Sequence, residues 1–286
     1  MTEETTTKFS FIAFRNLKKG LGDFDAVVEC NELAIREFIN NISTSSKPEK
    51  YISDLAIKHK VTVNTVSVPF FSARIRQFYI LSVLQQAEQF IDEFKKEYKM
   101  YFTSWDEKIY GETDLDNLLR NAFPSKENGV LNISKEVYDA FEYYRLVRNR
   151  FAHSEEKDLK RLENQRQLLN DYKEFYKINF NISGCPNTYT EINFDDFILC
   201  TNIVKSIGYT LCEKCKPDNS KIAERIVKLE IIQDNNAICP IKSIWKHKND
   251  NDRFLNALDN LLNSNFGKIG EIDRNEILEN INRILA

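Results

Sequence analysis

Hydrophobic positions recur every three or four residues along most of the chain, the spacing typical of amphipathic α-helices. The longest such pattern begins at Pro69 and continues to about Tyr101, with apolar positions at Ile75, Phe78, Tyr79, Val83, Ala87, Phe90, Ile91 and Phe94. Further patterns predict helices at about 23–42, 114–123, 134–153, 154–176, 194–214, 221–233, 241–247, 252–262 and 274–285. Only eight glycines and six prolines interrupt the 286 residues. This scarcity favours long helices with short connections, so the sequence predicts an all-α, mostly helical fold.

Breaks in the pattern suggest three segments. Residues 1–22 read as a flexible lead-in with a short apolar piece, Phe9 to Phe14, and Asn128-Gly129 reads as a turn. Residues 181–190, which contain a glycine and a proline, are the best candidate for an internal boundary. We therefore expect an N-terminal extension at 1–68, a helical core of four helices at 69–180 and a helical C-terminal region of unassigned role at 181–286.

Composition and charge narrow the class of protein. The chain is 42% hydrophobic and 29% charged, so it can bury a sizeable core. Its formal net charge is −3, and a nucleic-acid partner would therefore have to be met by a local patch. The chain has no long apolar run and no signal-peptide core at its polar N-terminus, so we expect a cytoplasmic protein without a membrane partner. Six irregularly spaced cysteines do not form a disulfide framework.

The strongest chemical signal is the stretch Arg148-Asn149-Arg150-Phe151-Ala152-His153, at the end of the helix expected from Ser134. The helix itself has one apolar stripe, formed by Val137, Phe141, Tyr144, Val147 and Phe151. The chain contains 14 Arg, 29 Asn and 3 His, so Arg-Asn-x3-His is expected by accident only about 0.015 times. The alternative explanation is that the arginines complement the dipole of the helix C-terminus.

The spacing also bears on geometry. Five residues of an ideal helix leave Arg148 and His153 about 140° apart, on different faces. Ser154 has the form of a helix N-cap, so we expect the helix to break near the motif and His153 to turn back toward Arg148. A guanidinium can hold a phosphate, and an imidazole can transfer protons near neutral pH. Together they suit RNA cleavage by attack of a ribose 2′-hydroxyl, a reaction that needs neither a metal nor another cofactor.

The motif Arg148-Asn149-x3-His153, at the end of the third helix of a four-helix unit, resembles the active-site motif of the HEPN superfamily (higher eukaryotes and prokaryotes nucleotide-binding domain). The resemblance covers about residues 69–178. It implies a four-helix bundle core and a metal-independent endoribonuclease, with Arg148 and His153 as the catalytic pair and Asn149 at the polar position. It also implies a homodimer with both motifs at one cleft, RNA as substrate, and a toxin or antiphage effector of the abortive-infection type, for which an antitoxin or activating protein would be a further partner. Glu88 loosely matches an acidic position of some members.

Other candidate sites have weaker support. Cys212-x2-Cys215 could be half of a zinc site with Cys185, Cys200, Cys239 or His247, but no second pair accompanies it. The two remaining histidines, His59 and His247, lie beside lysines, which is typical of solvent-exposed positions. Two basic clusters could contact RNA. They are Lys95, Lys96 and Lys99, and Lys242, Lys246, His247 and Lys248 near Trp245. Solvated helix faces explain both clusters equally well.

Two other functions stay open at this point. One is a non-catalytic HEPN-like module in which Arg148 and His153 bind a nucleotide or a protein. The other is a DNA-binding regulator that uses residues 51–68, where a faint helix-turn-helix pattern competes with the strand propensity of a Val/Thr run.

Overall fold

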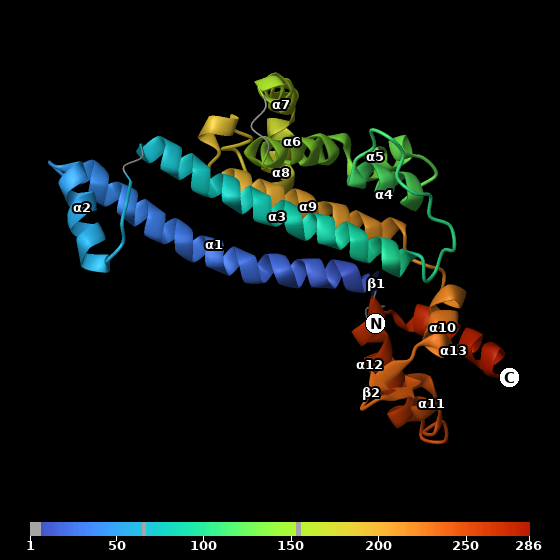
Figure 1. The fold of residues 1–286 in the computed structure, drawn as a ribbon. Coiled ribbons are helices and arrows are strands. Elements are labelled where there is room, and N and C mark those ends of the chain that lie inside the picture. The colour runs from blue at the N-terminus through green and yellow to red at the C-terminus, as the bar shows by residue number, and fades with distance from the viewer. Residues whose placement is uncertain (1–6, 65–66, 153–155) are drawn as a thin grey trace. The chain divides into compact units, whose positions relative to one another are not determined.

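The computed structural model describes residues 7–64, 67–152 and 156–286 and is dominated by helices (Figure 1). The all-α fold class expected from the sequence is confirmed. The helices are α1 (Ile12–Thr44), α2 (Pro48–His59), α3 (Val68–Tyr98), α4 (Asp114–Ala122), α5 (Lys126–Ile133), α6 (Lys135–Ala152), α7 (Glu156–Leu169), α8 (Lys173–Phe180), α9 (Phe194–Lys214), α10 (Asn219–Lys228), α11 (Pro240–Trp245), α12 (Asn251–Phe266) and α13 (Glu271–Leu285). Short 3-10 helices occupy Asn170–Tyr172 and Tyr189–Glu191.

Among the described residues, strands form two short antiparallel pairs. Lys8–Phe9 (β1) pairs with Gly267–Lys268 (β4), and Ile231–Gln233 (β2) pairs with Asn236–Ile238 (β3). Gly267 has φ +80°, and a Cβ at this position would lie 2.7 Å from the carbonyl oxygen of Lys8. A glycine is therefore required where β4 approaches β1.

The chain forms two compact units, each assembled from separated stretches. Unit 1 comprises residues 1–17, 88–133 and 207–286, and unit 2 comprises residues 18–87 and 134–206. This division differs from the sequential segments 1–68, 69–180 and 181–286, because three of its four boundaries lie inside the long helices α1, α3 and α9, and the fourth lies between α5 and α6. The stretch 181–190, expected to be a boundary, lies inside unit 2.

The core of unit 2 is formed by long helices that lie side by side (Figure 1). Phe38 of α1 contacts Phe71 of α3, and Phe197 of α9 contacts both Phe24 of α1 and Tyr79 of α3. A buried ion pair joins Glu32 of α1 to Arg76 of α3 at 2.6 Å.

The core of unit 1 uses residues that the sequence did not mark as helical. The expected flexible lead-in is wrong after residue 6, because α1 begins at Ile12 and its first turns are packed into the core. Phe14 contacts Phe90 of α3 and Tyr209 of α9. The buried apolar side chains here include Phe11, Phe14 and Leu17 of unit 1, followed by Leu21 where α1 continues into unit 2. Their spacing of three or four residues extends the apolar face of α1 toward the N-terminus.

Two further expectations are corrected within individual elements. Asn128-Gly129 lies inside α5 rather than in a turn, because α5 packs on α4: a Cβ on Gly129 would lie 2.8 Å from that of Leu119. The helix-turn-helix reading of residues 51–68 is also wrong. Residues 60–67 separate α2 from α3, whereas that motif joins its helices by a turn of about three or four residues.

Candidate functional site

Helix α6 carries the Arg148 motif and is fixed within unit 2 by buried tyrosines. The Ser134 hydroxyl accepts a hydrogen bond from the backbone N–H of Val137 at 3.3 Å, as expected for the start of the helix. The predicted stripe is buried at Val137, Phe141, Tyr144 and Val147, whereas Phe151 is half-buried. Tyr143 and Tyr144 are fully buried, and the Tyr143 hydroxyl donates to the carbonyl of Asn187. The orientation of α6 therefore depends on both apolar packing and polar contacts.

Asp196, at the start of α9, is the buried acceptor behind α6. Its carboxylate is 0% exposed and accepts a hydrogen bond from the Tyr144 hydroxyl at 3.0 Å. It also accepts from the backbone N–H and side-chain amide of Asn187, at 3.0 and 2.8 Å, and from the N–H of Asn193 at 3.0 Å. Burial raises the pKa of Asp196, while these hydrogen bonds oppose the rise. Burial also raises the pKa of Tyr144, so its phenol stays a donor.

Arg148 and Asn149 lie together in the last turns of α6. Both side chains are half-buried, and Nη1 of Arg148 donates to Oδ1 of Asn149 at 3.3 Å. Helix α6 ends at Ala152 and α7 begins at Glu156. His153 and Ser154 lie between these helices and outside the described residues. The structure thus brings together two of the three predicted site residues, Arg148 and Asn149.

A cluster of aromatic and cationic side chains surrounds Phe151, three residues after Arg148. The guanidinium of Arg74, from α3, lies 4.0 Å from the centre of the Phe151 ring. The Arg74 guanidinium also donates to the Tyr189 hydroxyl at 3.2 Å, and Phe78 meets Phe151 edge to face at 4.7 Å. Phe78 is 50% exposed. A cation and an accessible ring therefore stand beside the motif helix, all within unit 2.

Sequence reasoning missed the part that α3 plays in this cluster. Phe78 was expected in the apolar stripe of α3, yet half of its surface is accessible. Arg74 and Tyr189 were not singled out. The sequence does show that Arg74 and Gln77 are three residues apart, which places them on one face of the predicted helix. In the structure both side chains bind Tyr189. Tyr189 itself could not be connected to α3 without the tertiary structure.

The cysteine pair does not form a recognisable metal site. Cys212 and Cys215 are both buried near the end of α9. The thiol of Cys215 contacts the Ala122 carbonyl at 3.6 Å, and burial raises its pKa to about 12, which disfavours the thiolate that zinc prefers. Among the described residues, no group of three or more His, Cys, Asp or Glu side chains is arranged to hold a metal ion.

The other residues singled out from the sequence lie apart from the Arg148 motif or take part in structural contacts. Glu88 is half-buried on α3 and belongs to unit 1, whereas the motif belongs to unit 2. Lys95 pairs with Glu107 at 3.1 Å, and His59 is exposed at the end of α2. Trp245 packs on Phe254 with ring centres 5.0 Å apart, within unit 1.

Comparisons of the whole chain with known proteins add no functional assignment. Neither protein-family models, nor curated proteins, nor solved structures gave a match to it. No helix in the described part of the chain combines the length and the apolar character needed to cross a membrane.

Proposed function

We propose that the protein is a metal-independent endoribonuclease of the HEPN type that acts in the cytoplasm. The observation that carries the proposal is the Arg148-Asn149-x3-His153 motif at the C-terminal end of a well-anchored helix. Two of its side chains are in contact there. The identity of the family rests on the motif alone, and the proposed toxin or antiphage role rests on the same resemblance.

In the proposed reaction, the 2′-oxygen of a ribose attacks the adjacent phosphorus, and the bond from phosphorus to the 5′-oxygen breaks. His153 removes the proton from the 2′-hydroxyl or supplies one to the leaving 5′-oxygen. Arg148 stabilises the negative charge that develops on the phosphate, and Asn149 orients the guanidinium. The products are a 2′,3′-cyclic phosphate end and a 5′-hydroxyl end. The reaction needs no metal, because protons and charge are handled by these side chains.

One histidine per chain cannot easily serve as both the base and the acid of one step. A homodimer with two-fold symmetry would supply a second copy of the same motif. We therefore propose that the active enzyme is a dimer with both motifs facing one cleft. An antitoxin or activating protein would act on this assembly.

The cluster around Phe151 supports RNA as the substrate. Single-stranded RNA is commonly bound by stacking its bases on aromatic rings and arginine planes. Phe78 offers an accessible ring, and Arg74 offers a cation beside it, on the same unit as Arg148. A protein with net charge −3 needs such a local surface if it is to bind RNA.

The proposal is tested by incubating the purified full-length protein with total RNA in EDTA. We expect cleavage that leaves cyclic-phosphate ends, detected by mass spectrometry of the fragments. Arg148→Ala and His153→Ala should each lower the rate by about a hundredfold or more, the usual cost of removing a group that stabilises or protonates a transition state.

Arg145→Ala is the matched control, because Arg145 lies one turn earlier on α6 and binds Glu142 at 2.6 Å. It should cleave RNA at close to the native rate. Equal activity in all variants would contradict the assignment. RNA binding by the wild type without any cleavage would instead favour a non-catalytic binding module.

A further inference from the structure

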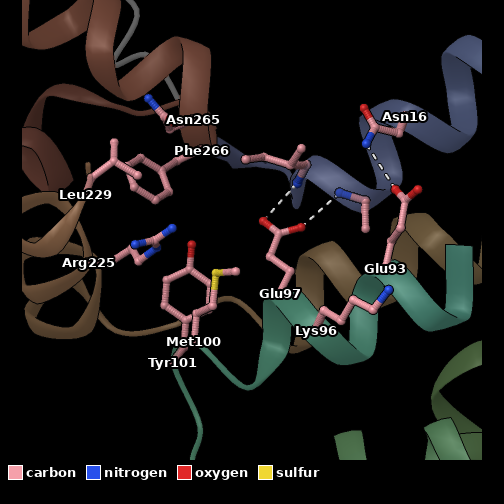
Figure 2. A pocket seen from close by; sticks show the side chains of 12 residues that line it. Asn16, Glu93, Lys96, Glu97, Met100, Tyr101, Arg225, Leu229, Asn265 and Phe266 are labelled. Carbon is pink, nitrogen blue, oxygen red and sulfur yellow. Dashed lines mark hydrogen bonds between the residues drawn. The ribbon is translucent and has the colours of Figure 1, made fainter. Parts of the chain in front are cut away.

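Unit 1 contains a pocket that is unrelated to the Arg148 motif. It has a volume of about 280 Å³ and is formed by α1, α3, α10, α12 and residues that directly follow α3 and α10. Figure 2 shows side chains from these segments around one space. Its apolar wall includes Ile12, Met100, Leu229 and Phe266.

The two carboxylates of the pocket are already engaged by the protein. Glu97 is 8% exposed, and its two oxygens accept the backbone N–H groups of Ile12 and Ala13 at 2.9 and 2.8 Å (Figure 2). Glu93 accepts from the side-chain amides of Asn16 and Gln89 at 3.0 and 2.8 Å. Each of the four carboxylate oxygens therefore has a donor. The acidic groups act as structural acceptors, and a cationic ligand would have to compete with these donors.

The cations of the pocket, unlike its carboxylates, have no hydrogen-bond partner among the described residues. Arg225 is half-buried, and its guanidinium makes no hydrogen bond or ion pair with the described residues. Burial raises the pKa of Glu97, and the charge of Arg225 partly opposes that rise, so the guanidinium acts on this carboxyl through space without binding it. It extends from α10 toward the hydroxyl of Tyr101 (Figure 2). Lys96 stands exposed at the rim and has no ion-pair partner among the described residues either. A bound anion would give this half-buried guanidinium the hydrogen-bond acceptors that the described residues do not supply.

Tyr101 adds a donor beside this cation. Burial raises the pKa of Tyr101, so its phenol remains protonated across the physiological range. Within the described part of the chain, its hydroxyl makes no hydrogen bond. The pocket thus presents a forked cation and a hydroxyl donor next to an apolar wall.

We propose that this pocket binds a small amphipathic anion, with its carboxylate or phosphate group on Arg225 and Tyr101 and its aromatic or branched aliphatic body against Phe266 and Leu229. An arginine fork matches either head group through two parallel hydrogen bonds. The volume of about 280 Å³ lies just below the range of about 300–1,000 Å³ found for small-molecule sites. The ligand is therefore the size of one or two fused rings and not a peptide or a nucleic acid.

The test is a calorimetric titration of the full-length protein with three probes that share one ring system. They are 1-naphthyl phosphate, 1-naphthoate and the neutral 1-naphthalenemethanol. We expect at least one anion to bind at least about tenfold more tightly than the neutral probe, because only an anion satisfies the guanidinium. The tighter anion identifies the preferred head group. Equal affinity for all three probes, or no binding of either anion, overturns the proposal.

Substitutions of Arg225 test whether the anion binds in this pocket. Arg225→Met should weaken binding of the preferred anion by about tenfold or more and leave the neutral probe unchanged, and Arg225→Lys should give an intermediate loss because it keeps the charge without the fork. Arg253→Met is the matched control, since Arg253 is exposed on α12 and does not line the pocket. Native anion affinity in Arg225→Met would overturn the proposal. The comparison of the three probes on the wild type stands even if that variant fails to fold.

Discussion

Asp196 in unit 2 and Glu97 in unit 1 are both buried carboxylates, but they bind different kinds of partner. Asp196 accepts hydrogen bonds from a tyrosine side chain, an asparagine side chain and two backbone N–H groups, which come from three separate stretches. Among the described residues, Glu97 accepts hydrogen bonds from two neighbouring backbone N–H groups at the start of α1 and from no side chain. Asp196 therefore ties the motif helix to its surroundings, whereas Glu97 completes one helix end.

The difference suggests how each unit supports its proposed site. In unit 2 the fixed element is α6, since Tyr144 lies one turn before Arg148 on the same helix. In unit 1 the fixed element is the first turn of α1, which forms one side of the pocket. Both tryptophans, Trp105 and Trp245, belong to unit 1, so their fluorescence follows that unit while circular dichroism follows all helices. The two carboxylates can therefore be tested separately.

The largest loss of stability is expected for Asp196→Ala. It leaves the buried Tyr144 hydroxyl and the donors of Asn187 and Asn193 without their acceptor, and we expect a loss of at least about 3 kcal/mol in the free energy of unfolding. Urea unfolding followed by far-ultraviolet circular dichroism measures it. Asp195→Ala is the control, because Asp195 is exposed in the first turn of α9 and should lose less than about 1 kcal/mol. Similar losses in the two variants would contradict the role of Asp196.

A smaller loss is expected for Glu97→Ala. Two backbone N–H groups lose their acceptor there, which we expect to cost about 2 kcal/mol. Tryptophan fluorescence during urea unfolding reports on it, because Trp105 lies in the same unit. Glu93→Ala, whose hydrogen bonds are exposed, should change stability by no more than about 0.5 kcal/mol. If Glu97→Ala were as harmless as this control, the helix-end role would be wrong.

The smallest expected effect is a loss of folding stability at low pH, and it depends on Asp273. Partial burial tends to raise the pKa of Asp273, but hydrogen bonds from Lys216, Thr7 and Asn219 prevail and lower it to about 2. The unfolded chain should titrate near the ordinary value for aspartate, about 3.9. The stabilisation from Asp273 is therefore complete above about pH 4 and is lost as the pH falls toward 2. Unfolding midpoints measured from pH 5 to pH 2 should fall less steeply in Asp273→Asn than in the wild type, and parallel curves would refute this assignment.

The sequence predicted those features that depend on neighbouring residues. The bounds of α9 agree with the expected 194–214, and Ser134 accepts the expected hydrogen bond at the start of α6. Arg148 and Asn149 are adjacent in the chain, so their spacing was enough to single them out. Local propensity and periodicity act within a few residues, and these features need nothing more.

Features that depend on distant residues could not be predicted in this way. The burial of Phe14 follows from contacts with Phe90 and Tyr209, and Gly129 is helical because it packs on Leu119. The pocket around Arg225 combines segments from both ends of the chain, so no spacing reveals it. Both units are assembled from separated stretches, and a division by sequence order therefore missed them.

The central claim is that Arg148 and His153 cleave RNA through the 2′-hydroxyl at the cut site. The most direct test uses a synthetic RNA that contains a mapped cleavage position, with the single ribose 5′ to the cut replaced by 2′-deoxyribose. In EDTA, we expect the wild-type protein to leave this position intact while it cuts the all-ribose strand to a cyclic-phosphate end. Cleavage of the deoxy-substituted strand at the same position would contradict the mechanism.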